Sequence, residues 1–541
     1  MTELPATELL ETHDVTNQPD AAGDRDLWAD DIVLRMLVGN DGKESALAAY
    51  GATLGQRDMR TAARNAERHA PELRLFDHAG RRLDEVVYHP DYHRFMATSI
   101  AAGYHSVAWE RDAGGHVVHA AMVYLASQVE PGHCCPLTMT YAAQPVIRAA
   151  EGLRDDWRAL ALAREYDPAA KPAKAKPGVT LGMAMTEKQG GSDVRANSTV
   201  AERQGDAWRL TGHKWFCSAP MSDGFLTLAR TGSGLTCFLV PRWLDDERNG
   251  IRIQRLKEKL GNRSNASAEI EYHRALAYRV GGDGAGVRTI VEMVHHTRLD
   301  TAIAPAGLMR AALREAHHWV SNRLAFQKRL IDQPLMRTVL ADLALDWQGA
   351  LTLGMHVARC FDGRTPEDRA FARIGVALAK YLNNKLCPTV VGEAMEVLGG
   401  MGYVEETMLP KLFREAPLNG IWEGSGNVIC LDVLRTLAKV PLAADALNAD
   451  LDSATGMDKT YDAALAEHRA RWQSPVPEAE ARWFAERTAL LLTASALLRL
   501  GEPRVAEAFV DSRLSGRRGR TSGALAPMHT NAVLAHGLEP A

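Results

Sequence analysis

The sequence predicts an α+β fold in which a β-rich segment lies between helical ones. From about residue 30 to 165 the apolar residues follow mostly helical spacing, and they do so again after Gly286. Between residues 179 and 280 the pattern changes to short β-rich runs separated by turn residues. A chain of 541 residues is long enough for several such domains.

The domain boundaries follow from these changes of pattern. We expect an N-terminal tail and helical domain over residues 1–178, a β domain over 179–285, a helical bundle over 286–440 and an extra C-terminal helical domain over 441–541.

In the N-terminal domain, residues 1 to about 30 are polar and irregular, and the helical pattern is clearest over 92–102 and 117–129. A Pro/Ala/Lys-rich stretch over 167–178 contains three prolines and a glycine, so we expect an exposed linker there.

The β domain and the bundle have equally distinct patterns. We expect strands over 179–185, 208–210, 225–229 and 235–240, because apolar and β-branched residues there are bounded by turn residues. The helical pattern then runs over 287–320, 336–361 and 369–398. The tail is helical and is interrupted at Pro475 and Pro477.

Composition excludes some functional classes. Apolar residues make up 46% of the chain and the formal net charge is −4, so the whole-chain charge gives no attraction to nucleic acid or to a membrane surface. Seven scattered cysteines favour a reducing compartment over a disulfide framework. The N-terminus lacks the pattern of a signal peptide and no long uncharged apolar run occurs, so we expect a cytoplasmic protein with no membrane contact.

The most informative segment is the loop from Met185 to Asp193, which follows the first predicted strand. It carries two hydroxyls, a Gly190–Gly191 pair and two carboxylates, so backbone amides can approach a planar or phosphorylated ligand. An ordinary polar turn would look the same. Three further motifs follow along the chain, over 212–218, 399–402 and 422–427.

In this order, the four motifs resemble the acyl-CoA dehydrogenase family of flavoproteins, from about residue 90 to 440. Residues 12–19, 188–190 and 259–267, together with the long tail, resemble a branch of that family that is linked to the response to DNA alkylation damage. The resemblance implies a β domain held between helical domains, FAD as cofactor, an acyl-CoA or related substrate, and a homo-oligomer, specifically a homotetramer.

The resemblance also implies which residues contact FAD, some of them across a subunit interface. They are Met185, Thr186, Gly191, Ser192, Trp215, Phe216, Ser218, Arg323, Phe326, Gln333, Gly399, Gly400, Ile421, Trp422, Gly424, Ser425 and Asn427. Two alternatives without cofactor contact remain open: Trp215 is an ordinary core residue, and Arg323 is a solvated arginine at a helix end.

Glu423 is the residue that we expect to carry the chemistry, as the base that removes the α-proton of an acyl thioester. Such a base needs an apolar setting in which burial raises its pKa. Arg298 occupies a family position near the active site. An ion-paired surface glutamate is the alternative reading of Glu423. Gly182, Lys188 and Gln189 depart from the usual family loop, so we expect weak dehydrogenase activity. The resemblance implies that this activity is isovaleryl-CoA-like.

No metal site is expected. His133, Cys134 and Cys135 offer too few ligands at usable spacing, and the glycines over 282–286 lack the spacing of a dinucleotide-binding motif.

A cluster of arginines in the tail is a candidate for binding double-stranded DNA. Arg513, Arg517, Arg518 and Arg520 lie close together, and each phosphate contact would contribute a salt-dependent term to affinity. The resemblance adds Arg435, which would lie near the active-site mouth. The alternative is that these arginines belong to a solvated tail that does not bind DNA. The functional alternatives are a metabolic acyl-CoA dehydrogenase with no DNA role, and a non-enzymatic DNA-shielding module with structural FAD.

Overall fold

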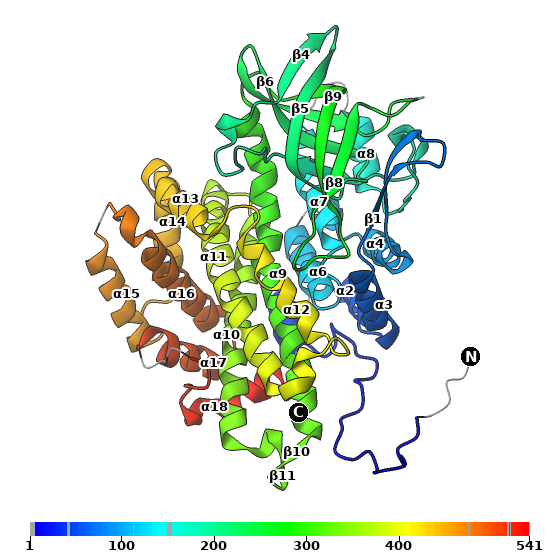
Figure 1. The fold of residues 1–541 in the computed structure, drawn as a ribbon. Helices are drawn as coiled ribbons and strands as arrows, with labels where there is room; N and C mark the ends of the chain where they lie inside the picture. The colour runs from blue at the N-terminus through cyan, green and yellow to red at the C-terminus, as the bar shows by residue number, and fades with distance from the viewer. Residues whose placement is uncertain are drawn as a thin grey trace.

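The computed structural model describes residues 6–39, 44–111, 113–148, 154–245, 247–473, 475–516, 519 and 521–539. Its β domain lies at one end of the molecule, above a layer of long helices, and the C-terminal helices flank those helices (Figure 1). The element order is therefore the predicted one, and the α+β fold is confirmed.

The N-terminal domain combines helices with one β-hairpin. Its elements are α1 (Ile32–Val38), α2 (Glu44–Leu54), α3 (Arg57–Arg68), β1 (Glu72–Phe76), β2 (Arg82–Val87), α4 (Pro90–Ala102), α5 (Val107–Glu110), α6 (Gly115–Ser127), α7 (Cys134–Ile147) and α8 (Arg154–Leu162). Helix α4 begins with Pro90, whose missing N–H costs nothing there, and ends at Gly103 with a φ of 87°.

This domain is mostly helical, as predicted, and the hairpin β1–β2 is an addition that the helical spacing did not indicate. Asp84 explains why the chain is extended here, since its carboxylate accepts a hydrogen bond from the Ile253 backbone amide of the β domain at 2.9 Å. Arg82 donates in turn to the Ile253 carbonyl at 2.8 Å. Tertiary contacts with the β domain thus override the local helical spacing.

The predicted linker over 167–178 is largely exposed and contains only a short 3₁₀ turn, Ala173–Ala175. Its end is anchored, however, because the buried Lys176 ammonium lies 2.6 Å from the Asp223 carboxylate. The linker is therefore not free along its whole length.

The β domain forms one sheet that closes on itself. Its strands are β3 (Leu181–Ala184), β4 (Val200–Gln204), β5 (Ala207–Ser218), β6 (Gly224–Thr231), β7 (Gly234–Pro241), β8 (Ile251–Leu256) and β9 (Ser267–Val280). Strand β5 pairs with β4 and β9, β9 with β7, β7 with β6, and β6 returns to β4. Buried residues of β6 and β7 fill its interior.

The bundle and the C-terminal domain are entirely helical apart from one two-stranded hairpin, β10 (Leu324–Ala325) and β11 (Lys328–Arg329), within the described residues. The bundle contains α9 (Gly286–Asn322), α10 (Pro334–Asp362), α11 (Pro366–Val397), α12 (Leu409–Glu415) and α13 (Gly426–Lys439). The three long helices are confirmed almost to their predicted ends. The C-terminal domain contains α14 (Pro441–Asp452), α15 (Lys459–Arg471), α16 (Ala481–Leu500), α17 (Pro503–Phe509) and α18 (Pro527–Gly537).

The described part of the chain has neither a membrane-spanning helix nor a cluster of metal ligands. None of its helices is both long and apolar enough to cross a bilayer. No group of three or more His, Cys, Asp or Glu side chains there could hold a metal ion.

Candidate active site

The loop that carries Glu423 is held in a strained conformation between α9 and α11. Glu423 has a φ of 57°, which is unfavourable for a residue with a long side chain, and Gly424 follows with a φ of 102°. Thr297 of α9 donates a hydrogen bond to the Glu423 carboxylate at 2.7 Å. Arg298 donates to the Glu423 backbone carbonyl at 3.2 Å. The carboxylate therefore has a fixed position and keeps one oxygen for another partner.

The surroundings of Glu423 suit a base. Burial raises the pKa of its carboxyl above the usual value, while the hydrogen bond from Thr297 and the charges of Arg298 and Lys380 act in the opposite direction. Lys380 is itself buried, and burial lowers the pKa of its ammonium to about 7. It donates to the Asn419 and Gly424 carbonyls, each at 2.8 Å, so it braces the loop on both sides of Glu423.

Arg298 acts on the position of Glu423 and does not contact its carboxylate in this structure. Its guanidinium lies 2.6 Å from Asp432 of α13, which Arg373 of α11 also approaches at 2.7 Å. Asp432 thus links three helices behind the Glu423 loop. Arg298 is better described as a positioning residue than as a catalytic one.

The two motifs of the β domain are joined by a buried ion pair. The Glu187 carboxylate lies 2.8 Å from the Lys214 ammonium, and both side chains are fully buried. Burial alone would raise the pKa of Glu187, but Lys214 and nearby backbone amides hold it at about 2. The Trp215 amide also donates to the Thr186 carbonyl at 2.8 Å. Thr186 and Trp215 therefore lie together, as the FAD prediction requires.

Trp215 and Phe216 form an aromatic surface beside a cation. The pairing of β5 with β9 shifts register between Lys214 and Cys217, so the strict alternation of side chains is interrupted. The Lys257 ammonium lies 3.3 Å from the centre of the Trp215 ring and 4.7 Å from that of Phe216. Phe216 is 47% exposed. An exposed aromatic ring with a neighbouring ammonium suits contact with a flat cofactor better than it suits a core.

Cys135 of α7 connects the β domain to the Glu423 loop. Its thiol interacts with the side chains of Ser218 and Asn265 and lies close enough to Glu423 for the two charges to interact; burial raises the pKa of this thiol to about 11. The structure brings together residues from α7, β5, α9, α11 and the loop after α12.

A second group of predicted residues lies at the other end of the long helices. Arg323 follows the last residue of α9, and a helix rises about 1.5 Å per residue, so Arg323 lies roughly 40 Å from Thr297. Phe326 forms the tip of the β10–β11 hairpin and is 91% exposed. Gln333 donates to the Ala325 carbonyl at 3.2 Å. Within one chain, this group does not meet the Glu423 group.

The remaining predicted cofactor residues are mostly accessible. A side chain at Gly191 would collide with the Thr186 hydroxyl, whereas Gly399 and Gly400 have open space around them. Ile421 is 64% exposed, and the Trp422 indole donates to the Asn419 amide oxygen at 2.6 Å. The other members of this set are half-buried or exposed: Met185, Ser192, Ser425 and Asn427.

One of the predicted DNA contacts is wrong. Arg513 is buried, and its guanidinium lies 2.6 Å from Asp342 and 2.9 Å from Asp346, both on α10. A guanidinium that neutralises two buried carboxylates is not available to a phosphate.

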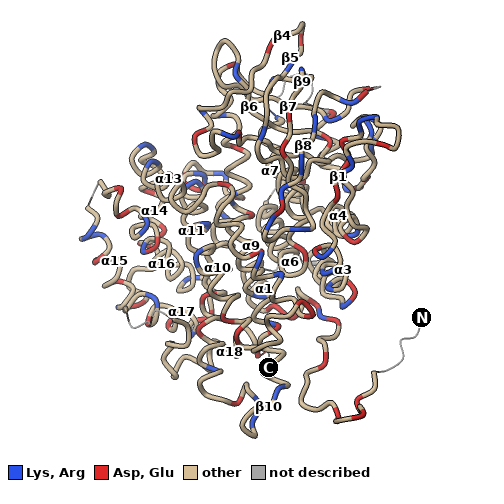
Figure 2. The backbone as a smooth tube through the Cα atoms, viewed as in Figure 1, with Lys and Arg blue, Asp and Glu red and all other residues tan. Residues whose placement is uncertain are grey.

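Arg435 remains accessible, with 64% of its side chain exposed, although it lies 4.0 Å from Asp432. Arg517, Arg518 and Arg520 lie outside the described residues. Both signs of charge are spread over all the domains (Figure 2).

Several residues at the site were missed by sequence reasoning. Thr297 stands next to Arg298, and a hydroxyl beside a predicted site residue was an available signal. Cys135 was considered only as a metal ligand. Lys380 gave no local signal, because it lies within a long helix and contacts the loop only through the fold.

Comparison with protein families assigns three parts of the chain. Residues 17–168 match the N-terminal domain of the adaptive response protein AidB. Residues 182–275 match the acyl-CoA dehydrogenase middle domain, and residues 284–438 match the acyl-CoA dehydrogenase C-terminal domain. The domains thus have the arrangement of an acyl-CoA dehydrogenase.

Similarity to individual proteins indicates the same class of protein. The AidB protein of Escherichia coli, whose name classes it with the acyl-CoA dehydrogenases, is 42% identical over 518 residues, which is 94% of this chain and 96% of the relative. Acyl-CoA dehydrogenase family member 11 of Caenorhabditis elegans is 32% identical and covers 77% and 70% of the two chains. The crystal structure of ACDH-11 from Caenorhabditis elegans in complex with C11-CoA has a TM-score of 0.83 at 26% identity and covers 97% of each chain. This chain belongs to the AidB-like acyl-CoA dehydrogenases, FAD-dependent oxidoreductases.

Proposed function

We propose that the protein binds FAD against the Trp215–Phe216 surface and uses Glu423 as the base of a weak acyl-CoA dehydrogenase reaction. The observation that carries this proposal is the Glu423 carboxylate: burial raises its pKa, its backbone is strained and Thr297 orients it. Thr186, Ser218 and the backbone around Gly191 would hold the isoalloxazine edge.

The chain's own groups account for the proton step. Glu423 removes the α-proton of the acyl thioester, and its raised pKa brings the strength of this base closer to that of an activated C–H acid. Thr297 keeps the carboxylate in one rotamer, and Arg298 and Lys380 keep the loop in place. FAD, when bound, supplies the acceptor for the β-hydride. The C11-CoA complex of the similar worm protein supports an acyl-CoA substrate. The family resemblance is the basis for the proposed isovaleryl-CoA-like activity.

The separation of the two groups of predicted FAD residues supports a homo-oligomer, and the family resemblance makes it a homotetramer. Because Arg323, Phe326 and Gln333 lie so far from Glu423 along α9, they would complete the FAD site of a neighbouring subunit. The exposed Phe326 and the open backbone at Gly399 and Gly400 are consistent with contacts outside the chain.

We further propose that the protein acts in the adaptive response to DNA alkylation damage and binds double-stranded DNA. The 42% identity to AidB over nearly the whole chain and the match of residues 17–168 to an adaptive response domain support this role. Arg435 and the tail residues Arg517, Arg518 and Arg520 are the proposed contacts. A DNA partner would place the protein in the cytoplasm.

The alternative is a metabolic acyl-CoA dehydrogenase without a DNA role. The burial of Arg513 favours it, because this arginine fastens the C-terminal domain to α10 and reduces the basic cluster. If this alternative holds, the C-terminal tail only supports the assembly of the protein.

Two measurements on the same preparation test the proposal. The purified protein should contain FAD that an acyl-CoA reduces slowly, and it should shift duplex DNA in a salt-sensitive way. Rapid turnover of an acyl-CoA without any DNA binding at low salt would favour the metabolic alternative. A protein that cannot be loaded with FAD would contradict both.

A further inference from the structure

The N-terminal arm, residues 6–22, runs along the outside of the molecule (Figure 1), and it contacts the β10–β11 hairpin on its way to the helices. Asn17 makes the contact. Its side-chain amide donates to the Leu324 carbonyl at 2.9 Å, and its amide oxygen accepts from the Leu324 backbone N–H at 2.7 Å. The Asn17 backbone carbonyl also accepts a hydrogen bond from the Arg323 guanidinium. One residue of the arm thus bonds both residues at the base of the hairpin.

The backbone of Asn17 suits this position. Its φ is 57°, in the left-handed region that asparagine adopts more readily than most other residues. The left-handed turn allows the side chain and the carbonyl of a single residue to face the hairpin together. The three hydrogen bonds follow from that geometry.

The hairpin itself needs external support. Phe326 and Gln327, its two central residues, have φ values of 52° and 63°, a conformation for which tight hairpins prefer asparagine and glycine. Leu324 is 49% exposed and Phe326 is 91% exposed, so packing within the chain contributes little. Arg323 lies between the Trp319 ring, 5.5 Å away, and the arm. Strained and exposed segments persist where other contacts hold them.

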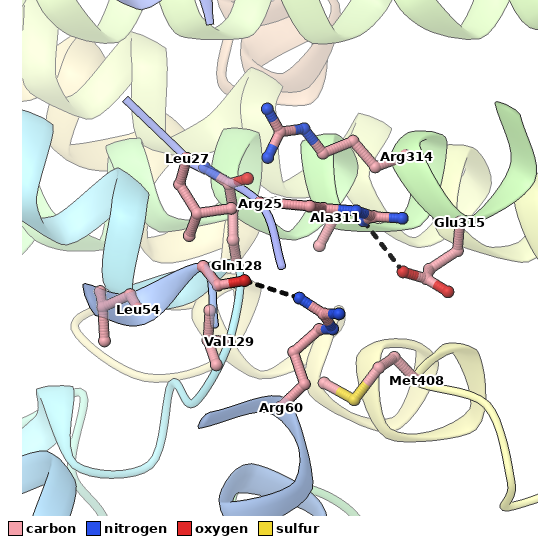
Figure 3. Close-up of a pocket in the computed structure, with 11 residues that line it drawn as sticks. Arg25, Leu27, Leu54, Arg60, Gln128, Val129, Ala311, Arg314, Glu315 and Met408 are labelled. Atoms are coloured by element: carbon pink, nitrogen blue, oxygen red, sulfur yellow. Dashed lines mark hydrogen bonds and ion pairs between the residues drawn. The ribbon is translucent and has the colours of Figure 1, made fainter. Parts of the chain in front are cut away.

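The arm can supply that support because it is anchored on its other side. The Arg60 guanidinium donates to the Ala22 and Gly23 carbonyls, each at 2.5 Å, and the Arg25 guanidinium lies 3.2 Å from the Glu315 carboxylate on α9. Figure 3 shows Arg25, Arg60 and Glu315 around a cavity of about 20 Å³, which has room for roughly one water molecule. Between the two anchors, the His318 ring lies 2.8 Å from the Asp20 carbonyl.

We infer that Asn17 is a positioning residue for cofactor binding: the arm fixes Arg323 and the hairpin in the orientation in which they meet the FAD of a neighbouring subunit. This inference rests on the proposed FAD role of Arg323. It assigns the arm a task that none of the four sequence motifs carries.

The test is a titration of FAD-free protein with FAD for four forms of the full-length chain: wild type, Asn17→Ala, Arg323→Ala and the double variant. We expect Asn17→Ala to raise the FAD dissociation constant roughly tenfold, as the loss of two hydrogen bonds would. The double variant should bind no more weakly than Arg323→Ala, because both changes interrupt the same contact. Gln18→Ala, an exposed neighbour in the arm, is the matched control and should bind FAD like wild type.

Two further measurements distinguish a positioning role of Asn17 from an effect on the stability of the fold. The melting temperature of the FAD-free protein should be the same in Asn17→Ala and wild type, and kcat at saturating FAD should be unchanged. Asn17→Asp, which retains the acceptor for the Leu324 N–H, should recover part of the affinity.

The outcomes distinguish the inference from the proposed function. If Arg323→Ala weakens FAD binding but Asn17→Ala does not, the inference is wrong and the proposed function stands. If FAD binds equally well to all four forms, the cofactor role of Arg323 is wrong and the inference fails with it.

Discussion

The Glu423 loop and the β10–β11 hairpin are both strained and both belong to the predicted FAD site, yet their support differs. Glu423 is held by Thr297, Arg298 and the nearby Lys380, all buried or half-buried side chains of its own bundle. The hairpin projects from the end of α9 with Phe326 almost fully exposed, and the arm and Gln333 contribute hydrogen bonds that hold it.

The difference indicates what each region is built for. The Glu423 loop is complete within one chain, so its geometry is set by folding. The hairpin presents strained backbone and an apolar side chain to solvent, which is expected of a segment that gains its final contacts in an oligomer. A mutation at the first region should affect chemistry, whereas one at the second should affect the binding of cofactor between subunits.

Glu423→Gln should have the largest effect. The amide cannot accept the α-proton, so acyl-CoA-dependent reduction of FAD should fall by about 10³-fold or more, while FAD and DNA binding persist. Stopped-flow absorbance of the flavin measures this loss. Glu406→Gln, at an exposed glutamate, is the control. A Glu423→Gln protein that reduces its flavin at the wild-type rate would show that the base lies elsewhere.

Arg513→Met should chiefly destabilise the fold. It leaves Asp342 and Asp346 buried without their cation, and removal of one partner from a buried ion network costs about 3–5 kcal/mol. Chemical unfolding monitored by circular dichroism gives the free energy. Duplex binding by the folded variant should be unchanged. Normal stability combined with lost DNA binding would return Arg513 to the DNA-contact group.

Arg518→Ala combined with Arg520→Ala should weaken DNA binding and leave the stability of the fold nearly unchanged. Loss of two phosphate contacts should lower the slope of log affinity against log salt by roughly 1.8, with little change in stability. Arg469→Ala, on the exposed face of α15, is the control. Binding titrations at several salt concentrations measure the slope, and an unchanged slope would remove the tail from the proposed DNA contacts.

Thr297→Val should give a smaller and more specific effect. The Thr297 hydrogen bond lowers the pKa of Glu423, so its removal should raise that pKa further. A base works only when deprotonated, so the decline of kcat/KM with falling pH should begin at a higher pH. Thr289→Val, earlier on the same helix, should leave the profile in place. An acid limb that moves downward would contradict the assigned hydrogen bond.

The sequence predicted those features that depend on local periodicity. Helices α9, α10 and α11 have the predicted spans because long apolar stripes and terminal prolines act locally. The hairpin β1–β2 was missed because its extended form depends on Asp84 and the β domain, far away in sequence. The wrong prediction for Arg513 has the same cause. Its partners lie on α10, and a run of arginines in the sequence does not reveal them.

The candidate site shows the same division. The motif residues Thr186, Ser218 and Glu423 could be taken from the sequence, since family resemblance locates them. Thr297, Lys380 and Cys135 surround Glu423 only because α7, α9 and α11 meet there. The contact between Asn17 and Leu324 is likewise set by the path of the arm.

Mixed oligomers provide the most direct test of the central claim, that one subunit supplies the Glu423 loop and another supplies the hairpin. Subunits carrying Glu423→Gln retain an intact hairpin, and subunits carrying Arg323→Ala retain an intact base. Co-assembly of the two should recover acyl-CoA-dependent flavin reduction that neither variant shows alone, measured at limiting FAD. If co-assembled oligomers stay as inactive as their parents, the two groups of residues do not complete a shared site.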